Sequence, residues 1–426
     1  MNLLVVGGGG REHAIIKKLK ENPQVETIYA LPGNGGIAAD AVCVPEIGAK
    51  DIEKIVEFAK AHAIDFAVVA PDDPLALGCV DRLHEAGIPC FGPDAKAARI
   101  EASKVFSKNL MKKYGIPTAK YEVFCDAGKA LQYLKDSEFP IVIKADGLAL
   151  GKGVLIPTNY DEAAAAIKSI MEDKAFGDSG NEVVIEEFLT GPEVSVLAFT
   201  DGTAIAPMVS SMDHKRAGDG DTGLNTGGMG TIAPNPYYTA DVAKRCMDEI
   251  FLPTLAAMRQ EGCPFKGCLY FGLMITPNGP KVIEYNCRFG DPETQVVLPL
   301  LETDLLEIMQ AVENETLADV EVRWSADSAA CVILASGGYP GSYAKGKAMT
   351  FPAAYPDNVT CYHAGDKLDG GTLVTSGGRV LGVTATAPTL AQALADAYAA
   401  ADTIDFDGKY MRHDIGRRAL AVLEEK

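Results

Sequence analysis

The sequence predicts an α/β protein whose N-terminal part is a parallel sheet with helices on both faces. Within residues 3–91, short β-branched apolar runs alternate with helix-like stretches. This alternation is typical of strand–helix–strand units. The expected strands are residues 3–6, 27–31, 66–70 and 88–91, and the expected helices are residues 12–20 and 51–61.

Composition and charge narrow the classes of function. The 426 residues are 47% hydrophobic and 23% charged, the balance of a soluble globular protein of several domains. A formal net charge of −19 repels polyanions, so we expect no nucleic-acid partner and no acidic-membrane binding. The longest apolar runs, such as residues 66–70 and 329–335, fall far short of the roughly 18 residues of a membrane span. Ten cysteines without a CxxC pair and an N-terminus without a basic leader favour free thiols in the cytoplasm.

A glycine-rich turn, Gly-Gly-Gly-Gly-Arg at residues 7–11, follows the first expected strand. The third glycine of a dinucleotide fingerprint would fall at Glu12, and no acid ends the second strand, so we reject a nicotinamide dinucleotide. Free backbone N–H groups, a helix N-terminus and the Arg11 guanidinium suit a single phosphate group. A tight strand-to-helix turn without a ligand is the alternative.

A second glycine-rich segment, residues 145–154, follows an expected strand at residues 141–144. It is not a P-loop, because Gly153 stands where Ser or Thr would bind magnesium. A glycine-rich hairpin can instead close over a triphosphate with its backbone amides, while Lys144 and Lys152 supply positive charge.

The most glycine-rich loop of the chain covers residues 217–230 and begins after Asp-His-Lys-Arg at residues 213–216. Six glycines in this loop make ordering costly, so we expect it to be mobile until a ligand binds. A plain surface loop is the alternative. His214 either moves a proton or holds the loop by a hydrogen bond.

The strands expected at residues 268–275 and 281–285 form a hairpin. Glu284 and Asn286 are two residues apart and therefore share a face, and Arg288 follows if the strand continues. A carboxylate and an amide oxygen are hard ligands suited to Mg²⁺, and Arg288 would neutralise phosphate or bind a carboxylate.

After Trp324 the pattern restarts, with strands expected at residues 329–334 and 380–386 and a helix at residues 390–401. We interpret this part as a third domain that covers the site.

Seven segments spread along nearly the whole chain form an ordered set. They are residues 8–14, 144–149, 151–154, 185–189, 213–216 (Asp-His-Lys-Arg), 225–230 (Asn-Thr-Gly-Gly-Met-Gly) and 286–294 (Asn-Cys-Arg-Phe-Gly-Asp-Pro-Glu-Thr). The set resembles the glycinamide ribonucleotide synthetase family of ATP-grasp ligases.

This resemblance implies an ATP-grasp fold in the α/β class. An N-terminal Rossmann-like domain would cover residues 1–101, an ATP-grasp domain residues 102–326 with a mobile flap subdomain around residues 120–190, and a C-terminal α+β domain residues 327–426. It also implies ATP and Mg²⁺ or Mn²⁺ as cofactors, glycine and 5-phosphoribosylamine as substrates, and a cytoplasmic monomer.

The resemblance also implies roles for individual residues. Nucleotide-binding residues would be Lys104, Lys144, Gly151, Lys152, Gly153, Glu186, Glu187, Leu189 and Glu193. Substrate-binding residues would be Gly8, Gly9, Gly10, Arg11, Asp72, Asp213, Lys215 and Arg288. Catalytic residues would be Arg288, Asp213, Lys215 and His214, and metal ligands would be Glu284 and Asn286.

Some positions depart from the family pattern. Asp72 stands where the family usually has Glu, so its reach to the substrate is shorter. Leu150 and Leu224 replace the commoner Ala and Pro. Gly272 stands where the wider ATP-grasp group often has an acid, which leaves metal binding to rely more on Glu284.

The implied reaction is a carboxylate–amine ligation. Phosphorylating glycine gives glycyl phosphate, whose phosphate leaves when the phosphoribosylamine nitrogen attacks, giving glycinamide ribonucleotide, ADP and phosphate in purine biosynthesis. The metal, the lysines and Arg288 would bring the two anions of the first step together. A carboxylase of the biotin-carboxylase type, another ATP-grasp ligase and a catalytically silent ATP sensor are the alternatives.

Overall fold

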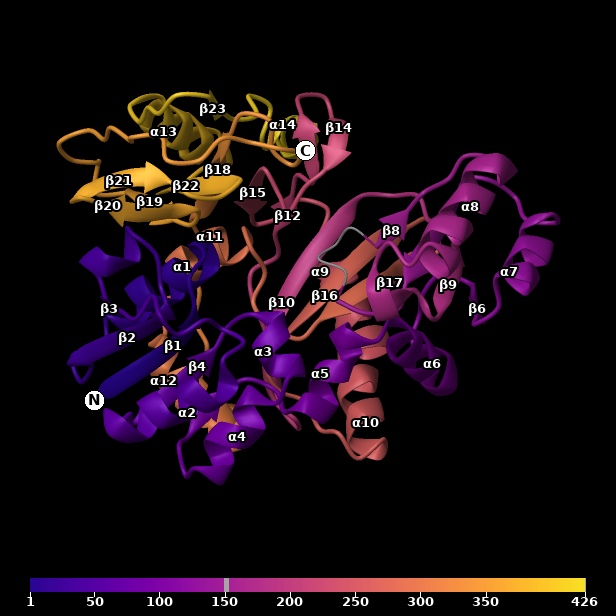
Figure 1. Ribbon diagram of the computed structural model, residues 1–426, viewed down its shortest axis with the longest axis horizontal. Helices are drawn as coiled ribbons and strands as arrows, with labels where there is room; N and C mark the ends of the chain where they lie inside the picture. The colour runs from indigo at the N-terminus through magenta and orange to yellow at the C-terminus, as the bar shows by residue number, and fades with distance from the viewer. Residues whose placement is uncertain (149–152, 426) are drawn as a thin grey trace.

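The computed structural model describes residues 1–148 and 153–425. An N-terminal sheet and a C-terminal sheet lie on one side of the molecule. A central sheet extends from them toward a smaller unit of strands and helices (Figure 1). None of the helices in the described residues is long and apolar enough to cross a membrane.

The N-terminal sheet is parallel throughout, in the strand order β3-β2-β1-β4-β5, as the sequence predicts. Along β1, Leu4 and Val6 pack into one core while Leu3 and Val5 pack into another, so both faces are covered. The elements are β1 Asn2–Gly7, α1 Gly10–Leu19, β2 Thr27–Pro32, β3 Val42–Cys43, α2 Ile52–Ala61, β4 Phe66–Val69, α3 Asp72–Ala76, α4 Cys79–Glu85, β5 Cys90–Phe91 and α5 Ala95–Ala102.

The central sheet is antiparallel, in the order β11-β10-β16-β17. Its register shifts between Gly272 and Leu273, so that Ile283 is an extra residue on β17. Tyr285 is buried in the core behind the sheet, whereas Glu284 and Asn286 lie on the other face. The elements are α6 Lys104–Tyr114, β10 Glu193–Asp201, β11 Ile205–Pro207, α9 Ala240–Cys246, α10 Leu252–Gln260, β16 Lys266–Thr276 and β17 Gly279–Asn286.

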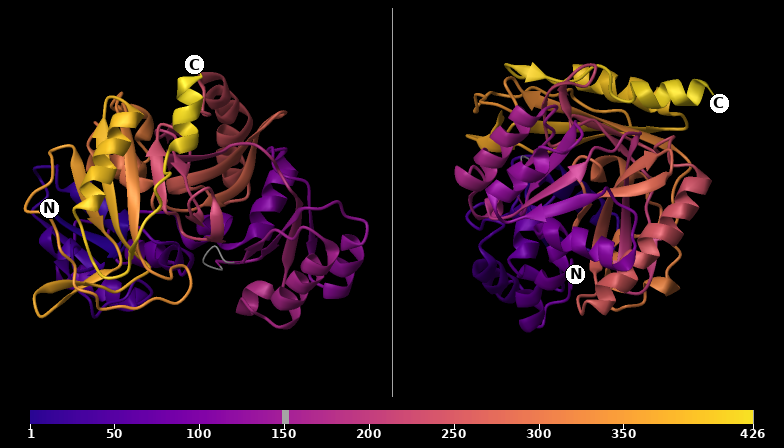
Figure 2. Two further views of the ribbon diagram at one scale, coloured as in Figure 1. Left: turned by 90° about the horizontal axis from the view of Figure 1, so that it is seen from above. Right: turned by 90° about the vertical axis from the view of Figure 1, so that its right-hand side faces the viewer.

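The smaller unit projects from the main body and has a core of its own (Figure 2). Its sheet has the order β6-β9-β7-β8, and β7 and β8 form the predicted hairpin, whose tip at residues 149–152 lies outside the described residues. The strand β6 is not predicted from the sequence. The elements are β6 Tyr121–Phe124, α7 Ala127–Leu134, β7 Ile141–Ala145, β8 Val154–Leu155, α8 Tyr160–Ile167 and β9 Val183–Glu187.

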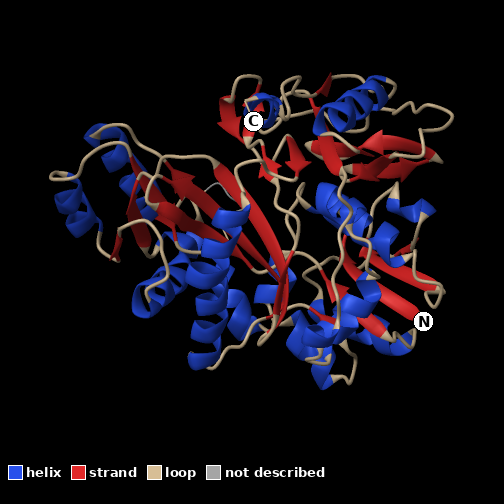
Figure 3. Cartoon of the chain, turned by 180° about the vertical axis from the view of Figure 1, so that it is seen from behind, coloured by secondary structure: helices blue, strands red, loops and turns tan. Residues whose placement is uncertain are grey.

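The C-terminal sheet has the order β12-β15-β18-β22-β19, with β23 beside β18, and the helices α13 and α14 lie over it (Figure 3). Two of its strands, β12 and β15, come from the middle of the chain, which the sequence pattern does not predict. The elements are β12 Met212–Asp213, β15 Gly230–Ala233, α11 Thr294–Val297, β18 Ser328–Ser336, β19 Val359–His363, β20 Asp366–Asp369, β21 Thr372–Thr375, β22 Arg379–Ala387, α13 Leu390–Asp402, β23 Lys409–Tyr410 and α14 Arg417–Glu424. The helix α12 Leu305–Glu313 packs instead against β5 of the N-terminal sheet and β10 and β16 of the central sheet.

The glycine-rich loop at residues 217–230, whose mobility stays a prediction, is not an open loop in the structure. It forms a two-stranded hairpin, β13 Arg216–Gly218 with β14 Thr222–Asn225. The glycines do not leave it open, because Asp219, Asp221 and Gly220 are bonded to the C-terminal segment. Those contacts are between residues about 190 positions apart, and a local sequence pattern contains no sign of them.

Candidate active site

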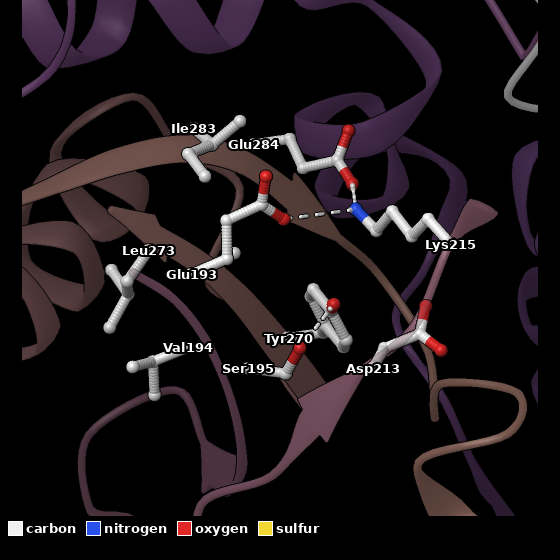
Figure 4. A pocket seen from close by; sticks show the side chains of 10 residues that line it. Glu193, Val194, Ser195, Asp213, Lys215, Tyr270, Leu273, Ile283 and Glu284 are labelled. Carbon is white, nitrogen blue, oxygen red and sulfur yellow. Dashed lines mark hydrogen bonds and ion pairs between the residues drawn. The ribbon is translucent and has the colours of Figure 1, made fainter. Parts of the chain in front are cut away.

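A pocket lies over the central sheet where β10, β16 and β17 run side by side, and the segment after β12 borders it (Figure 4). The register places Gly272 between Ser195 and Glu284 in neighbouring strands, so no side chain separates the two at this level. The lining residues are Glu193, Val194, Ser195, Asp213, Lys215, Tyr270, Gly272, Leu273, Ile283 and Glu284.

Lys215 extends across this pocket between two carboxylates. Its Nζ lies 3.8 Å from Oε2 of Glu193 and 4.0 Å from Oε1 of Glu284 (Figure 4). Burial disfavours the charged amine, but the carboxylates of Glu193 and Glu284 hold the pKa of Lys215 well above its ordinary value. The side chain keeps 42% of its exposure, so a charged ammonium is available to a ligand.

Glu284 is ionised for a related reason. Although burial raises its pKa, Lys215, Lys144 and Lys104 together lower the pKa below the ordinary value. The Nζ of Lys144 donates to the Ile283 carbonyl at 3.0 Å, and the β-bulge leaves this carbonyl free of the strand ladder. Lys144 therefore lies beside the strand segment that carries Glu284.

Two buried lysines share one buried carboxylate beside this pocket. Lys144 Nζ lies 3.0 Å from Oε1 of Glu186, and Lys108 Nζ lies 3.1 Å from Oε2. Burial lowers the pKa of Lys108 to about 8. The sequence analysis missed Lys108, although it lies four residues after Lys104 on α6 and therefore on the same helix face.

Lys104 is held at the base of the glycine-rich hairpin. Its Nζ donates to the Gly147 carbonyl at 2.7 Å. Asp146 accepts from the Val105 N–H at 3.0 Å and from the Ser103 hydroxyl at 3.2 Å, so the strand end β7 is bonded to the first turn of α6. Burial lowers the pKa of Lys104.

Arg288 follows β17 and contacts a buried acid that the sequence analysis missed. Its Nη2 lies 3.1 Å from Oε1 of Glu101 and donates to Oδ1 of Asn286 at 3.2 Å. The Nε atom of Arg288 is buried without a hydrogen-bond partner among the described residues. Burial opposes the charge, but Glu101 and Asp72 raise the pKa of Arg288 above its ordinary value, so Asp72 lies within the electrostatic range of this group.

Asp213 stands beside a buried polar cluster. The Tyr270 hydroxyl donates to Oε1 of Glu293 at 3.0 Å and lies 2.8 Å from the Ser195 hydroxyl. Burial, together with the Glu293 carboxylate, raises the pKa of Asp213 well above its ordinary value. Glu293 belongs to a segment that the sequence analysis quoted, but its role was not predicted.

The contacts of His214 favour the second of its two predicted roles, which is to hold the loop by hydrogen bonds. The imidazole is buried, its Nδ1 lies 3.0 Å from the Gly230 carbonyl, and its Nε2 accepts from the Gly416 N–H at 3.1 Å. Burial lowers its pKa to about 4. Both ring nitrogens are occupied by backbone groups, so the geometry argues against the predicted catalytic role.

In the turn after β1, some of the groups predicted to bind phosphate are already bonded to a side chain of the protein. The buried carboxylate of Glu12 accepts from the Gly9 N–H at 2.7 Å and from Nε of Arg11 at 2.7 Å. A Cβ on Gly8 would lie 2.3 Å from the Gly33 carbonyl, so this position requires glycine. The N-terminus of α1 therefore already has an acidic cap, which weakens the predicted phosphate site at this helix end.

The remaining predicted residues lie at the end of β9, next to β8, or outside the residues that the structure describes. Glu187 accepts from the Lys120 N–H at 2.9 Å and from Lys281 at 3.3 Å, and Leu189 is half-buried beyond β9. Gly151 and Lys152 lie outside the described residues, whereas Gly153 lies just before β8.

The donor set at β17 fits a hard divalent cation. Glu284 offers an ionised carboxylate and Asn286 an amide oxygen on the same strand face. No group of three or more His, Cys, Asp or Glu side chains that could hold a metal occurs in residues 1–148 and 153–425. A metal at this pair would therefore take its other ligands from phosphate oxygens and water.

Comparisons with known proteins agree with this geometry. Family models for the N domain, the ATP-grasp (A) domain and the C domain of phosphoribosylglycinamide synthetase match residues 1–101, 102–294 and 329–418. The chain belongs to the phosphoribosylglycinamide synthetase family. The resemblance and the ATP-grasp fold predicted from the sequence are thereby confirmed.

Relatives in this family match the chain from end to end. A phosphoribosylamine–glycine ligase of Vibrio cholerae is 47% identical over 429 residues, covering 100% of both chains. A bifunctional purine biosynthetic protein of Pichia angusta is 50% identical over 99% of this chain, which spans 54% of that relative.

Solved structures show the same arrangement. The crystal structure of a phosphoribosylamine–glycine ligase from Thermotoga maritima has a TM-score of 0.86 and 35% identity, covering 97% of this chain and 100% of that one. A biotin carboxylase from Campylobacter jejuni, with a TM-score of 0.74 and 14% identity, covers 96% of this chain and 92% of that one and shares the fold alone.

Proposed function

We propose that the protein is an ATP-dependent ligase that joins glycine to 5-phosphoribosylamine through glycyl phosphate, giving glycinamide ribonucleotide, ADP and phosphate. The observation that carries this proposal is the position of the Lys215 ammonium 4.0 Å from the Glu284 carboxylate, with Lys144 bonded to the neighbouring Ile283 carbonyl. Family membership over the whole chain supports the same reaction. ATP use follows from the ATP-grasp family model.

ATP would occupy the cleft between the smaller unit and the central sheet. Lys104 and Lys144 would contact its phosphates, since their ammonium groups lie near Glu284. The segment from Glu186 to Leu189 would border the adenine, and Glu193 would bind the ribose hydroxyls. The flap would close over the triphosphate with Gly151, Lys152 and Gly153, of which the structure describes only Gly153.

Glu284 and Asn286 would hold Mg²⁺ or Mn²⁺. When bound, the cation would neutralise charge on the transferred phosphoryl group. The protein contributes the ionised carboxylate and the fixed strand face, and Arg288 keeps the Asn286 amide oriented by its hydrogen bond to Oδ1.

The glycine side of the reaction would use Asp213, Lys215 and Arg288. Glycine carries both an ammonium and a carboxylate, so Asp213 would bind the former while Arg288 and Lys215 attract the latter toward the γ-phosphate. This arrangement reduces the repulsion between two anions, which is the main obstacle to the first step. Phosphoribosylamine would be bound from the side of Gly8–Arg11 and Asp72.

The direct test is ADP release by the purified protein. We expect release to require both glycine and phosphoribosylamine, and bicarbonate without glycine to give none. Equal release with bicarbonate alone would support a carboxylase and refute the ligase proposal. Nucleotide binding without turnover would support a sensor and would also refute it.

Glu284→Gln supplies a sharper form of this test. We expect a loss of about 10²–10³ in glycine-dependent turnover, because removing one electrostatic group from such a site has this effect. Glu249→Gln, on a helix surface and paired only with Arg245, is the control and should keep full activity. A Glu284→Gln enzyme with wild-type turnover would remove the metal site from the proposal.

The assembly and location of the protein are further proposals. We infer that it works as a monomer in the cytoplasm, with small-molecule substrates and no nucleic-acid or membrane partner. The net charge of −19 supports the lack of polyanion binding. Light scattering during size-exclusion chromatography would decide the oligomeric state.

A further inference from the structure

The C-terminal segment, residues 410–418, runs against the hairpin β13–β14. Figure 1 shows α14 beside this hairpin, and the Tyr410 hydroxyl of β23 donates to the Ala217 carbonyl in the hairpin. The hairpin begins at Arg216, immediately after Lys215, so whatever holds the hairpin also acts on the position of Lys215.

Lys215 lies between the strand β12 and the hairpin. β12 is two residues long and pairs with β15, and the His214 backbone continues this pairing by hydrogen bonds to Gly230 and Met229. The Lys215 carbonyl accepts from the Thr226 N–H at 2.7 Å and from the Thr226 hydroxyl at 2.8 Å, and both bonds belong to the hairpin. The orientation of Lys215 therefore depends both on this strand pairing and on how the hairpin is fixed to the rest of the molecule.

Arg412 provides that attachment from a fully buried position. Its side chain is 1% exposed, and its Nη1 donates to the Arg216 carbonyl at 3.1 Å and to Oδ1 of Asp221 at 3.0 Å. Its Nε and Nη2 donate to the two oxygens of Asp414 at 2.8 and 2.9 Å. A planar guanidinium is needed here, because only its fixed fork can satisfy acceptors on two different segments at once.

Neighbouring residues repeat the same attachment. Asp414 Oδ2 also accepts from the Gly220 N–H at 2.8 Å, and Asp219 accepts from the His413 N–H at 2.7 Å. The Gly416 N–H donates to Nε2 of His214, the residue before Lys215. The C-terminal segment thus bonds to the chain on both sides of Lys215.

We propose that Arg412 is a positioning residue for the substrate side of the active site, which it serves by fixing the segment Asp213–Lys215 through the hairpin. The proposal rests on the proposed function, because it assigns Asp213 and Lys215 to the glycine and phosphoribosylamine side. It predicts a larger effect on these substrates than on ATP, whose predicted contacts lie mainly on α6, β7 and β9, with Glu193 on β10 beside Lys215.

The test compares three variants in steady-state kinetics with each substrate varied in turn. Arg412→Met should raise KM for glycine or phosphoribosylamine by about tenfold to a hundredfold, as small displacements of positioned groups do. KM for ATP should rise much less, through the contact of Lys215 with Glu193. Arg412→Lys, which keeps the charge without the fork, should recover part of the loss.

Arg418→Met is the matched control. Arg418 lies 3.5 Å from the same Asp221 but is 60% exposed and does not bond to Arg216, so all KM values should stay at wild-type levels. If Arg412→Met does not fold, Asp221→Asn replaces it. Asp221 has φ +56°, a conformation that asparagine tolerates, so this variant loses the charge without backbone strain.

Two results would overturn the proposal. In one, Arg412→Met or Asp221→Asn lowers kcat in proportion to the folded fraction while every KM is unchanged, which is the behaviour of a purely structural residue. In the other, KM for ATP rises as much as KM for glycine. A wild-type protein without glycine-dependent ADP release would instead refute the proposed function itself.

Discussion

Single residues in the site owe their charge states to their neighbours. Glu186 forms ion pairs with Lys108 and Lys144, and none of the three side chains is more than slightly exposed. Glu284 is ionised among lysines, whereas Asp213, beside Glu293, has a raised pKa. Burial favours the neutral form of both Glu284 and Asp213, so the direction of each pKa shift depends on whether the neighbouring charges are opposite or alike.

His214 gives a pH prediction at the residue scale. An unfolded chain binds a proton at this imidazole below its ordinary pKa of 6.5, while the folded chain does so only below about 4. The free energy of unfolding therefore falls as the pH is lowered through this window, and His214 should account for a loss of about 2 kcal/mol between pH 7 and pH 5.

Urea unfolding of the wild type and of His214→Asn at both pH values measures this contribution. The variant should lose about 2 kcal/mol less than the wild type over the same interval. His62→Asn, at an exposed histidine, is the control and should follow the wild type. Equal losses in all three proteins would mean that the folded protein binds the proton at His214 as readily as the unfolded chain.

At the scale of elements, a single carboxylate joins the strand β7 to the helix α6. Because Asp146 accepts from Val105 and Ser103, Asp146→Ala should cost about 1 kcal/mol in stability, as loss of a helix cap does. It should also raise KM for ATP, since Lys104 in the same first turn loses its fixed place beside Gly147.

Asp126→Ala separates the loss of stability from the effect on KM for ATP. Asp126 caps α7 by accepting from the Lys129 N–H at 2.8 Å, in the same small unit but away from Lys104. Thermal unfolding should show a similar loss in both variants, and ATP titration should show a higher KM only in Asp146→Ala. A rise in KM for ATP in Asp126→Ala as well would contradict this reasoning.

The sequence predicts those elements that carry a local pattern. β1, β4 and α2 lie within one or two residues of their predicted bounds, because β1 and β4 are short apolar runs buried on both faces and α2 repeats a helical apolar period. Glu284 and Asn286 share a face for the same reason. The hairpin β13–β14 could not be predicted, because its own strand pairing is joined by contacts with the distant residues Arg412 and Asp414.

Site residues that depend on distant partners were missed for a similar reason. Lys108 pairs with Glu186, and Glu101 pairs with Arg288, across separations of 78 and 187 residues, which follow from the residue numbers. On the sequence alone each resembles an ordinary polar position on a helix. The i,i+4 spacing from Lys104 indicates that Lys108 lies on the same helix face, but no feature of the sequence marks Glu101 as a site residue.

At the scale of the whole molecule, the N-terminal and C-terminal sheets meet at the turn after β1. Nδ2 of Asn34 donates to the Gly8 carbonyl at 3.0 Å and to the carbonyls of His363 and Ala364 at 2.9 and 3.2 Å. Asp366 is buried against the same loop and accepts from the Gly36 N–H at 3.0 Å. The geometry of the Gly8–Arg11 turn is therefore determined by both ends of the chain.

Asn34→Ala tests whether this joint serves the substrate or only the fold. The substitution leaves three buried or half-buried carbonyls with one partner fewer, so we expect a loss of about 1–3 kcal/mol in stability and a higher KM for phosphoribosylamine. Asn22→Ala is the matched control, because Asn22 also bridges distant segments, donating to Asp304 at 3.0 Å, but lies away from the turn. Both variants should unfold at lower urea concentrations, and only Asn34→Ala should change KM for phosphoribosylamine. If KM for phosphoribosylamine is the same in both, the turn does not bind this substrate, and the N-terminus of α1 serves the protein's own carboxylates of Glu12 and Asp291.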